Sequence, residues 1–147
     1  TPDKIMYLPQ VSFIPRHLTL KRIFKDLGHD FTEFISQFPE FDKYYNSKFK
    51  VLSGGERRIV EIYIILISKT KFCLLDEPFS HVMPIHIDLI KNLILKEKNK
   101  KGIIITDHLF EHVLDISDKL YVLSNGKTHL TENPDDIEKL GYAITKK

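Results

Sequence analysis

Two acidic residues end an apolar run in the middle of the chain. The apolar residues 72–75 (FCLL) are followed directly by Asp76 and Glu77. Adjacent carboxylates at the end of a buried strand are costly unless a cation or a water network uses them. Asp76 is therefore a candidate ligand of Mg²⁺, and Glu77 is a candidate for orienting an attacking water. Taken alone, the pattern also fits an ordinary strand exit with two acidic turn residues.

A serine, two glycines and a glutamate open a long helical pattern at residues 53–56. Ser53 and Glu56 have the spacing of a capping box, in which each side chain bonds to a backbone N–H near the helix start. That box does not explain Gly54 and Gly55, since glycine has poor helix propensity. Without side chains in the way, the free N–H groups of the first turn can bind an anion. The motif therefore predicts phosphate recognition.

Two single polar residues follow other predicted strands. His108 comes shortly after the apolar residues 103–105, and Gln10 follows a short strand pattern at residues 5–8. Alone, a histidine is more often structural, and a glutamine carries almost no signal. However, the ends of parallel strands face one crevice in an open sheet. We therefore expect His108 and Glu77 to face the same crevice if their strands are neighbours.

The elements that position these residues alternate between strand and helix. The unbroken apolar strands at 72–75 and 103–105 flank a helical pattern from Pro84 to about Lys98, which predicts a parallel βαβ unit buried on both faces. A buried helix is expected from Gly54 or Gly55 to about Lys69. Asn125-Gly126 between two strand-like runs predicts a hairpin, and a short helix follows at 134–140. The fold class is therefore α/β.

Residues 11–51 have a different composition, rich in Phe and Tyr at helical spacing. Thr19 can cap a helix there, and Gly28 can end it. We expect a small helical insert between the first strand and the buried helix.

The charge and the apolar runs exclude several classes of protein. The chain has 147 residues with 22 basic and 20 acidic side chains, so its formal charge of +2 gives no reason to expect nucleic acid as a partner. The longest apolar run, residues 62–67, is far shorter than the roughly 18 residues of a membrane span. The single cysteine, Cys73, allows no internal disulfide.

Taken in order, these features resemble the Q-loop, signature motif, Walker B strand and H-loop of ABC transporter ATP-binding subunits. The resemblance runs from about Lys4 to Gly141, and the LSGGE sequence at residues 52–56 is its specific part. The runs YLPQ at 7–10 and ITDH at 105–108 are similar to the lipopolysaccharide-export and branched-chain amino-acid subgroup. The resemblance implies a partial RecA-like P-loop NTPase core of mainly parallel strands, with a small helical subdomain at about 11–69. The C-terminal part of the core would span about 70–147, so that 1–147 is a single incomplete ATPase domain.

The resemblance also implies ligands, partners and residue roles. ATP and Mg²⁺ would be the ligands, and a second ATPase subunit and a transmembrane subunit the partners, at the inner face of the cell membrane. Asp76 would hold Mg²⁺ through its water shell, Glu77 would be the catalytic carboxylate, and His108 would contact the γ-phosphate. Gln10 would sense Mg²⁺ and the attacking water, and would link the site to the membrane partner. Four signature residues would close over ATP on the opposite subunit: Ser53, Gly54, Gly55 and Glu56.

The aromatic insert would contribute to a groove that receives a helix of the transmembrane subunit. The aromatic residues in question are Phe13, Phe24, Phe31 and Phe34. Plain packing within the insert explains any one of them at least as well.

The sequence departs from the family pattern at two points. Met83 stands where the family usually has an aspartate before the next helix. There is also no G-x-x-x-x-G-K-[ST] sequence, whose backbone N–H groups would wrap the phosphates. We expect the P-loop to precede Thr1 in a longer parent protein, and residues 1–147 alone to be inactive.

Two other functions remain open. A degenerate domain kept for assembly would tolerate Met83, although Glu77 and His108 are intact. A DNA-repair or chromosome-maintenance ATPase would place a long coiled coil before the signature, whereas Gln10 precedes Leu52 by only 42 positions.

The resemblance also carries an expectation about the strand at 103–106, which would lie beside the P-loop strand. Without that neighbour, we expect either that the hairpin at 119–130 pairs with 103–106 or that the chain self-associates.

Overall fold

Three parallel strands form the sheet on which the fold is built. The computed structural model describes residues 4–131 and 134–140. Strands β1 (Ile5–Leu8), β2 (Phe72–Asp76) and β3 (Gly102–Thr106) lie in the order β1-β2-β3. In register, Leu8 faces Leu75 and Leu75 faces Ile105, with both pairs of strands parallel. The predicted parallel βαβ unit is therefore confirmed, but the expectation that it is buried on both faces is wrong, since Phe72 and Ile104 are exposed on the face that the helices do not cover.

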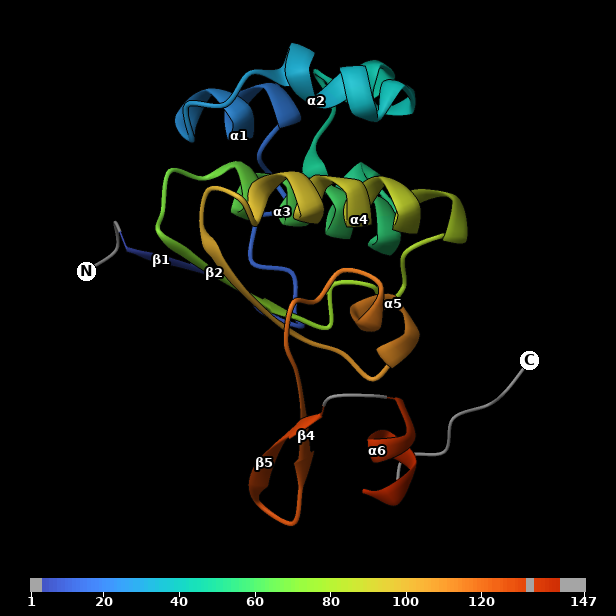
Figure 1. The fold of residues 1–147 in the computed structure, drawn as a ribbon. Helices are drawn as coiled ribbons and strands as arrows, with labels where there is room; N and C mark the ends of the chain where they lie inside the picture. The colour runs from blue at the N-terminus through green and yellow to red at the C-terminus, as the bar shows by residue number, and fades with distance from the viewer. Residues whose placement is uncertain (1–3, 132–133, 141–147) are drawn as a thin grey trace.

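Two long helices cover one face of this sheet (Figure 1). They are α3 (Gly54–Ile67) and α4 (Pro84–Glu97), and strand residues such as Leu8, Cys73 and Leu75 are buried beneath them. Every residue of α3 from Arg58 to Leu66 is buried, because the helix lies between the sheet and the helical insert. The expected buried helix is confirmed. The division of the chain near residue 69 stays a prediction, since α3 packs on both parts.

The insert contains α1 (Leu20–Asp26), α2 (Phe31–Gln37) and two 3₁₀ turns, Pro39–Tyr44 and Phe49–Val51. Thr19 caps α1 by accepting a hydrogen bond from the Arg22 N–H, and Gly28 follows the helix at a φ of 69°. That positive φ suits glycine, which has no Cβ to clash there. Both helix boundaries expected from the sequence are confirmed.

The aromatic side chains of the insert fall into two groups. Phe24 and Phe34 are buried in the core, where they pack on Tyr63 of α3, so packing explains them and their assignment to a partner groove is wrong. Phe13 is exposed, and Phe31 is half-buried. The groove remains a prediction for these two.

The C-terminal part contains α5 (Phe110–Leu114), β4 (Leu120–Ser124), β5 (Lys127–Thr131) and α6 (Pro134–Lys139). Strands β4 and β5 form the expected antiparallel hairpin, with Asn125 and Gly126 at φ values of 50° and 74° in its turn. Two successive positive φ angles are those of a type I′ turn, whose twist matches the flanking strands.

The hairpin does not pair with β3, so that part of the expectation for the 103–106 strand is wrong. Strands β4 and β5 form a separate two-stranded sheet, which stands away from β1-β2-β3 in Figure 1. The reason is local: the chain is held in the main core at Ile116, just before β4, and the two hairpin strands satisfy each other's hydrogen bonds.

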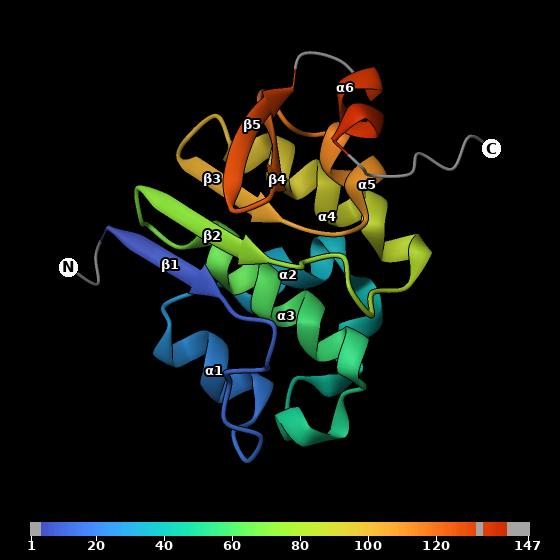
Figure 2. The ribbon, with the colours of Figure 1, turned by 90° about the horizontal axis from the view of Figure 1, so that it is seen from below.

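One face of the three-stranded sheet is left open by the described residues (Figure 2). Four apolar side chains on this face are between 47% and 58% exposed, namely Ile5, Tyr7, Phe72 and Ile104. Leu74, which lies between Tyr7 and Ile104, is half-buried. Such a patch is a common place for association, and self-association of the chain stays a prediction. Among the described residues, no helix is both long and apolar enough to cross a membrane.

Candidate functional site

The candidate site lies where β2 and β3 end side by side. Asp76 is the register partner of Thr106, and the N–H of Glu77 donates to the carbonyl of Thr106 at 2.7 Å. Because the two strands are parallel, both end at the same edge of the sheet, as expected. The structure thus brings the Asp76-Glu77 pair next to the residues that follow β3.

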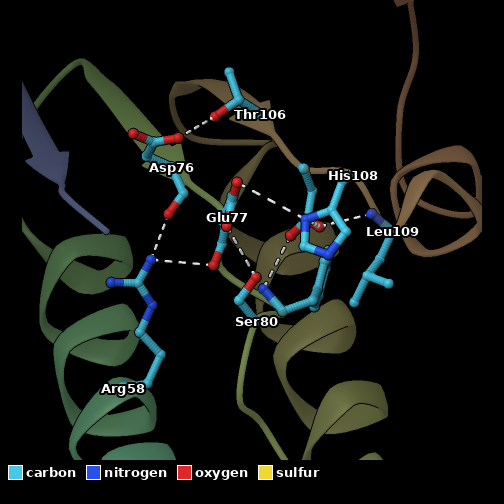
Figure 3. Close-up of polar contacts among 9 residues, drawn as sticks. Arg58, Asp76, Glu77, Ser80, Thr106, His108 and Leu109 are labelled. Atoms are coloured by element: carbon cyan, nitrogen blue, oxygen red, sulfur yellow. Dashed lines mark hydrogen bonds and ion pairs between the residues drawn. The ribbon is translucent and has the colours of Figure 1, made fainter. Parts of the chain in front are cut away.

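Asp76 is held by two hydroxyl groups. Its Oδ1 accepts a hydrogen bond from Thr106 Oγ1 at 2.6 Å (Figure 3). Its Oδ2 accepts one from the Tyr7 hydroxyl at 3.1 Å. The hydrogen bond to Asp76 raises the pKa of Tyr7, because it favours the protonated phenol. The carboxylate therefore has a fixed orientation on the open face of the sheet.

This set of oxygen atoms suits Mg²⁺, which prefers carboxylates, hydroxyls and water. Within residues 4–131 and 134–140, no group of three or more His, Cys, Asp or Glu residues could hold a metal ion. Proteins commonly bind Mg²⁺ through one or two carboxylates together with several waters and substrate phosphates, and Asp76 is a carboxylate of this kind.

Glu77 has a strained backbone. Its φ is 48°, in the left-handed region that a residue with a Cβ rarely adopts. The carboxylate accepts a hydrogen bond from Ser80 Oγ at 3.2 Å. Strain of this kind costs about 1–3 kcal/mol and is concentrated at functional sites. We interpret it as the means by which the chain turns the Glu77 side chain into the crevice.

His108 lies beside Glu77, as expected. Its Nδ1 is 3.8 Å from Glu77 Oε1 and 3.7 Å from Asp107 Oδ1, both too long for a hydrogen bond (Figure 3). The imidazole is exposed and is therefore free to contact a ligand as well as Glu77. No result tests the roles assigned to these residues, so the roles remain predictions.

Asp107 is a site residue that the sequence reasoning missed. Its side chain is 0% exposed. It accepts hydrogen bonds from the N–H groups of Phe79 at 3.1 Å and Leu109 at 2.8 Å. One carboxylate thus ties the turn after β2 to the turn after β3. The bond to the residue two positions on is an Asx turn, which an aspartate at a strand exit could have indicated.

The capping box at the start of α3 is confirmed. Ser53 donates its N–H to Glu56 Oε2 at 2.7 Å, and the Glu56 N–H donates to Ser53 Oγ at 3.2 Å. Tyr44 also donates to the Glu56 carboxylate. Burial acts to raise the pKa of Glu56, but the hydrogen bonds from Ser53 and Tyr44 outweigh it, so the pKa lies below its usual value. The Glu56 carboxylate therefore already accepts hydrogen bonds from two residues of its own chain.

The two glycines of the motif have different surroundings. Among the described residues, nothing lies within 4 Å of the position that a Cβ on Gly54 would take. A Cβ on Gly55 would stand 2.6 Å from the carbonyl oxygen of His81, whose φ is 64°. Gly54 thus leaves room for a ligand, whereas Gly55 allows the loop after β2 to approach α3.

This difference gives a testable prediction. We expect Gly55→Ala to destabilise the fold by about 1–3 kcal/mol, because the new methyl group meets a backbone carbonyl. Gly54→Ala should leave stability unchanged or slightly higher, since alanine favours a helix and meets no atom. Urea unfolding of the two variants beside the wild type measures both effects. Equal stabilities for the two variants would contradict the assignment.

Gln10 shares a cavity with the signature and with Glu77. The cavity has a volume of about 350 Å³, and its lining includes Gln10, Gly54, Glu77 and His81. Residues from the segment after β1, from the start of α3 and from the end of β2 therefore meet around one space. Asp76 and His108 do not line it, and lie to its side at the strand ends.

Met83 stands at the N-cap position of α4. An aspartate there could accept a hydrogen bond from the first turn of the helix, but a methionine side chain cannot. Pro84 at the first helical position reduces the loss, because it has no N–H to satisfy. Met83 is exposed, so the departure from the family pattern removes a side-chain cap from the start of α4 at the surface.

Comparison with known proteins agrees with this geometry. The family model described as ABC transporter matches residues 1–80. The lipopolysaccharide export system ATP-binding protein LptB of Haemophilus influenzae is 37% identical, over 90% of this chain and 60% of the relative. The protein of the same name from Escherichia coli K12 is 34% identical over the same shares. The chain thus spans about 60% of the length of these relatives.

A solved structure supports the fold. The ATP-binding subunit of an ABC transporter superposes with a TM-score of 0.74 at 21% identity, covering 93% of this chain and 62% of that one. At this identity the likeness shows the fold alone. The RecA-like α/β fold class expected from the sequence is confirmed, as is the similarity to the lipopolysaccharide-export group.

Proposed function

The chain belongs to the ABC transporter family of ATP-binding proteins, and from this membership we propose that the full-length protein hydrolyses ATP to drive transport through a membrane partner. The observation that carries the proposal is the meeting of Gln10, Gly54 and Glu77 around one cavity. Each comes from a different element, and each is the type of residue that phosphate and water chemistry needs at that place.

Glu77 is the proposed catalytic carboxylate. Its backbone strain and its bond from Ser80 fix the side chain in the crevice, where it can accept a hydrogen bond from the attacking water. His108, close to the same carboxylate, is placed to donate to a phosphate oxygen. Asp76, whose two carboxylate oxygens are fixed by the hydroxyl groups of Tyr7 and Thr106, would hold Mg²⁺ through its water shell. Bound Mg-ATP supplies the transferable phosphoryl group and a cation that neutralises its charge.

The proposed partners follow from the same comparison. A second copy of the ATPase would meet the signature residues Ser53, Gly54 and Gly55, which are at the surface or half-buried. A transmembrane subunit would contact the residues around Gln10. The relatives are named after a lipopolysaccharide export system, and a transmembrane subunit of such a system is the kind of partner we propose. The protein would then work at the inner face of the membrane.

The proposal is tested by phosphate release from ATP with the purified full-length protein, with and without Mg²⁺. We expect Mg²⁺-dependent turnover. A protein that binds ATP but shows no turnover would instead support the second candidate, a non-catalytic domain with an assembly role. Met83 favours that candidate, because its side chain cannot cap α4 as the family's aspartate could.

A further prediction concerns residues 1–147 on their own. Their sequence has no G-x-x-x-x-G-K-[ST] motif to wrap the phosphates. We therefore expect no measurable affinity for Mg-ATP in the low-micromolar range. Isothermal calorimetry on this polypeptide checks the prediction, and clear low-micromolar binding would refute it.

A further inference from the structure

Arg58 lies one turn into α3, and its guanidinium is buried between two segments of the chain. The residue is 7% exposed. Its Nη1 donates to the carbonyl of Pro9, which precedes Gln10. Its Nη2 donates to the carbonyl of Asp76 and, at 3.1 Å, to that of Glu77 (Figure 3). Arg58 therefore bonds to the backbone of the Gln10 segment and to that of both acidic residues.

Glu61 lies nearly one turn further along the same side of α3 and is 1% exposed. Its Oε1 accepts three hydrogen bonds: from Ser12 Oγ at 2.6 Å, from the Phe13 N–H at 3.0 Å and from the Ile14 N–H at 3.3 Å. Three donors on one buried carboxylate oxygen hold this part of the chain tightly, because charged acceptors make the stronger hydrogen bonds.

The two side chains hold the segment on both sides of Gln10. Arg58 holds Pro9, and Glu61 holds residues 12–14, while Gln10 and Val11 between them are exposed. We call residues 9–14 the Gln10 loop. Because α3 is a continuous helix of 14 residues, the loop and the end of β2 are attached to one stiff element.

Nearby carboxylates offset part of the cost of burying the Arg58 guanidinium. Burial lowers the pKa of Arg58, and the carboxylates of Glu61, Asp76, Asp107 and Glu77 oppose that shift. A buried guanidinium that lost its partners would be costly. Its planar fork can donate to two segments at the same time, which the single ammonium of lysine cannot match.

We propose that Arg58 and Glu61 are a positioning pair, which makes the Gln10 loop and the Asp76-Glu77 strand end move as one body with α3. A displacement of the loop then shifts the backbone that carries Glu77. Both side chains also border the cavity shared by Gln10, Gly54 and Glu77, and we assign them a positioning role because of their hydrogen bonds to the two segments. The inference deepens the proposed function and rests on it only where turnover is measured.

Hydrogen exchange tests the coupling without any need for activity. Glu61→Gln keeps the shape of the side chain but removes its charge, and the hydrogen bonds of Glu61 join it to the loop and not to the end of β2. In the full-length protein we expect exchange at the Phe13 and Ile14 amides to rise about tenfold, as the loss of a charged acceptor implies. The coupling requires the Glu77 and Ser80 amides to exchange faster as well, while the amides of α4 keep their rates. A change confined to the loop, or an equal rise everywhere, would refute the proposal.

Turnover provides the second test, with Arg58→Lys and the matched control Arg22→Lys. Arg22 is an exposed residue of α1 that bonds to Asp26 on its own helix, so its replacement leaves both segments attached. We expect Arg58→Lys to lower kcat for ATP about tenfold or more with KM within about twofold, and Arg22→Lys to change neither.

The double variant Arg58→Lys with Glu61→Gln separates a pair from two independent contacts. If the two residues act as a pair, kcat of the double variant should be no lower than kcat of the more affected single variant. A fall in kcat equal to the product of the two single effects would overturn the inference. If the wild type shows no turnover, the proposed function fails, and the exchange experiment still decides whether the two segments are coupled.

Discussion

Glu77→Gln in the full-length protein is expected to stop ATP turnover while leaving ATP binding intact. The amide has nearly the same shape as the carboxylate, so it keeps the bond from Ser80 and the contact with His108. It cannot accept a proton from the attacking water or carry the charge that orients that water. General-base catalysis contributes about 100- to 10,000-fold, and we expect kcat to fall by an amount in this range.

Two measurements are needed for this prediction. Phosphate release gives kcat, and binding of a fluorescent ATP analogue gives the affinity, which should stay within about twofold of the wild type. Glu111→Gln is a matched control, because it makes the same chemical change on an exposed residue of α5. A Glu77→Gln protein that turns over ATP at nearly the wild-type rate would show that another group orients the water.

The local structure was largely predictable from the sequence. The capping box, the Asn125-Gly126 turn and the apolar strands each depend on a few neighbouring residues, and each is present in the structure. The neighbouring positions of Glu77 and His108 also followed, since parallel strands end at the same edge. These features have in common that their cause lies within one element or one βαβ unit.

Features that depend on distant contacts were not predictable. The reach of Arg58 across two segments, the bonds of buried Asp107 and the approach of His81 to Gly55 join residues that are far apart in sequence. The predicted pairing of the hairpin with β3 was wrong for the same reason. Whether β4 joins β3 or turns away depends on competing contacts around Ile116 that no sequence pattern records.

The aromatic insert gives the largest expected effect on stability. Phe34 is 0% exposed, and its ring centroid lies between 4.9 and 5.8 Å from those of five other aromatic rings. These belong to Phe24, Phe31, Phe38, Phe41 and Tyr63. Tyr63 is 2% exposed, and its burial raises its pKa to about 12.

Phe34→Ala should therefore lower the free energy of unfolding by about 3–5 kcal/mol, because it removes a buried ring and leaves a cavity in a close-packed cluster. The control is Phe13→Ala, since Phe13 is 41% exposed and its loss should cost less than about 1 kcal/mol. Urea unfolding gives both values from the shift in midpoint. Because Phe34→Ala is a severe change, Phe34→Leu provides a milder variant, expected to cost about 1–2 kcal/mol. If Phe34→Leu and Phe13→Ala are equally stable, the insert is not held together by this cluster, and its aromatic residues would again be candidates for a partner surface.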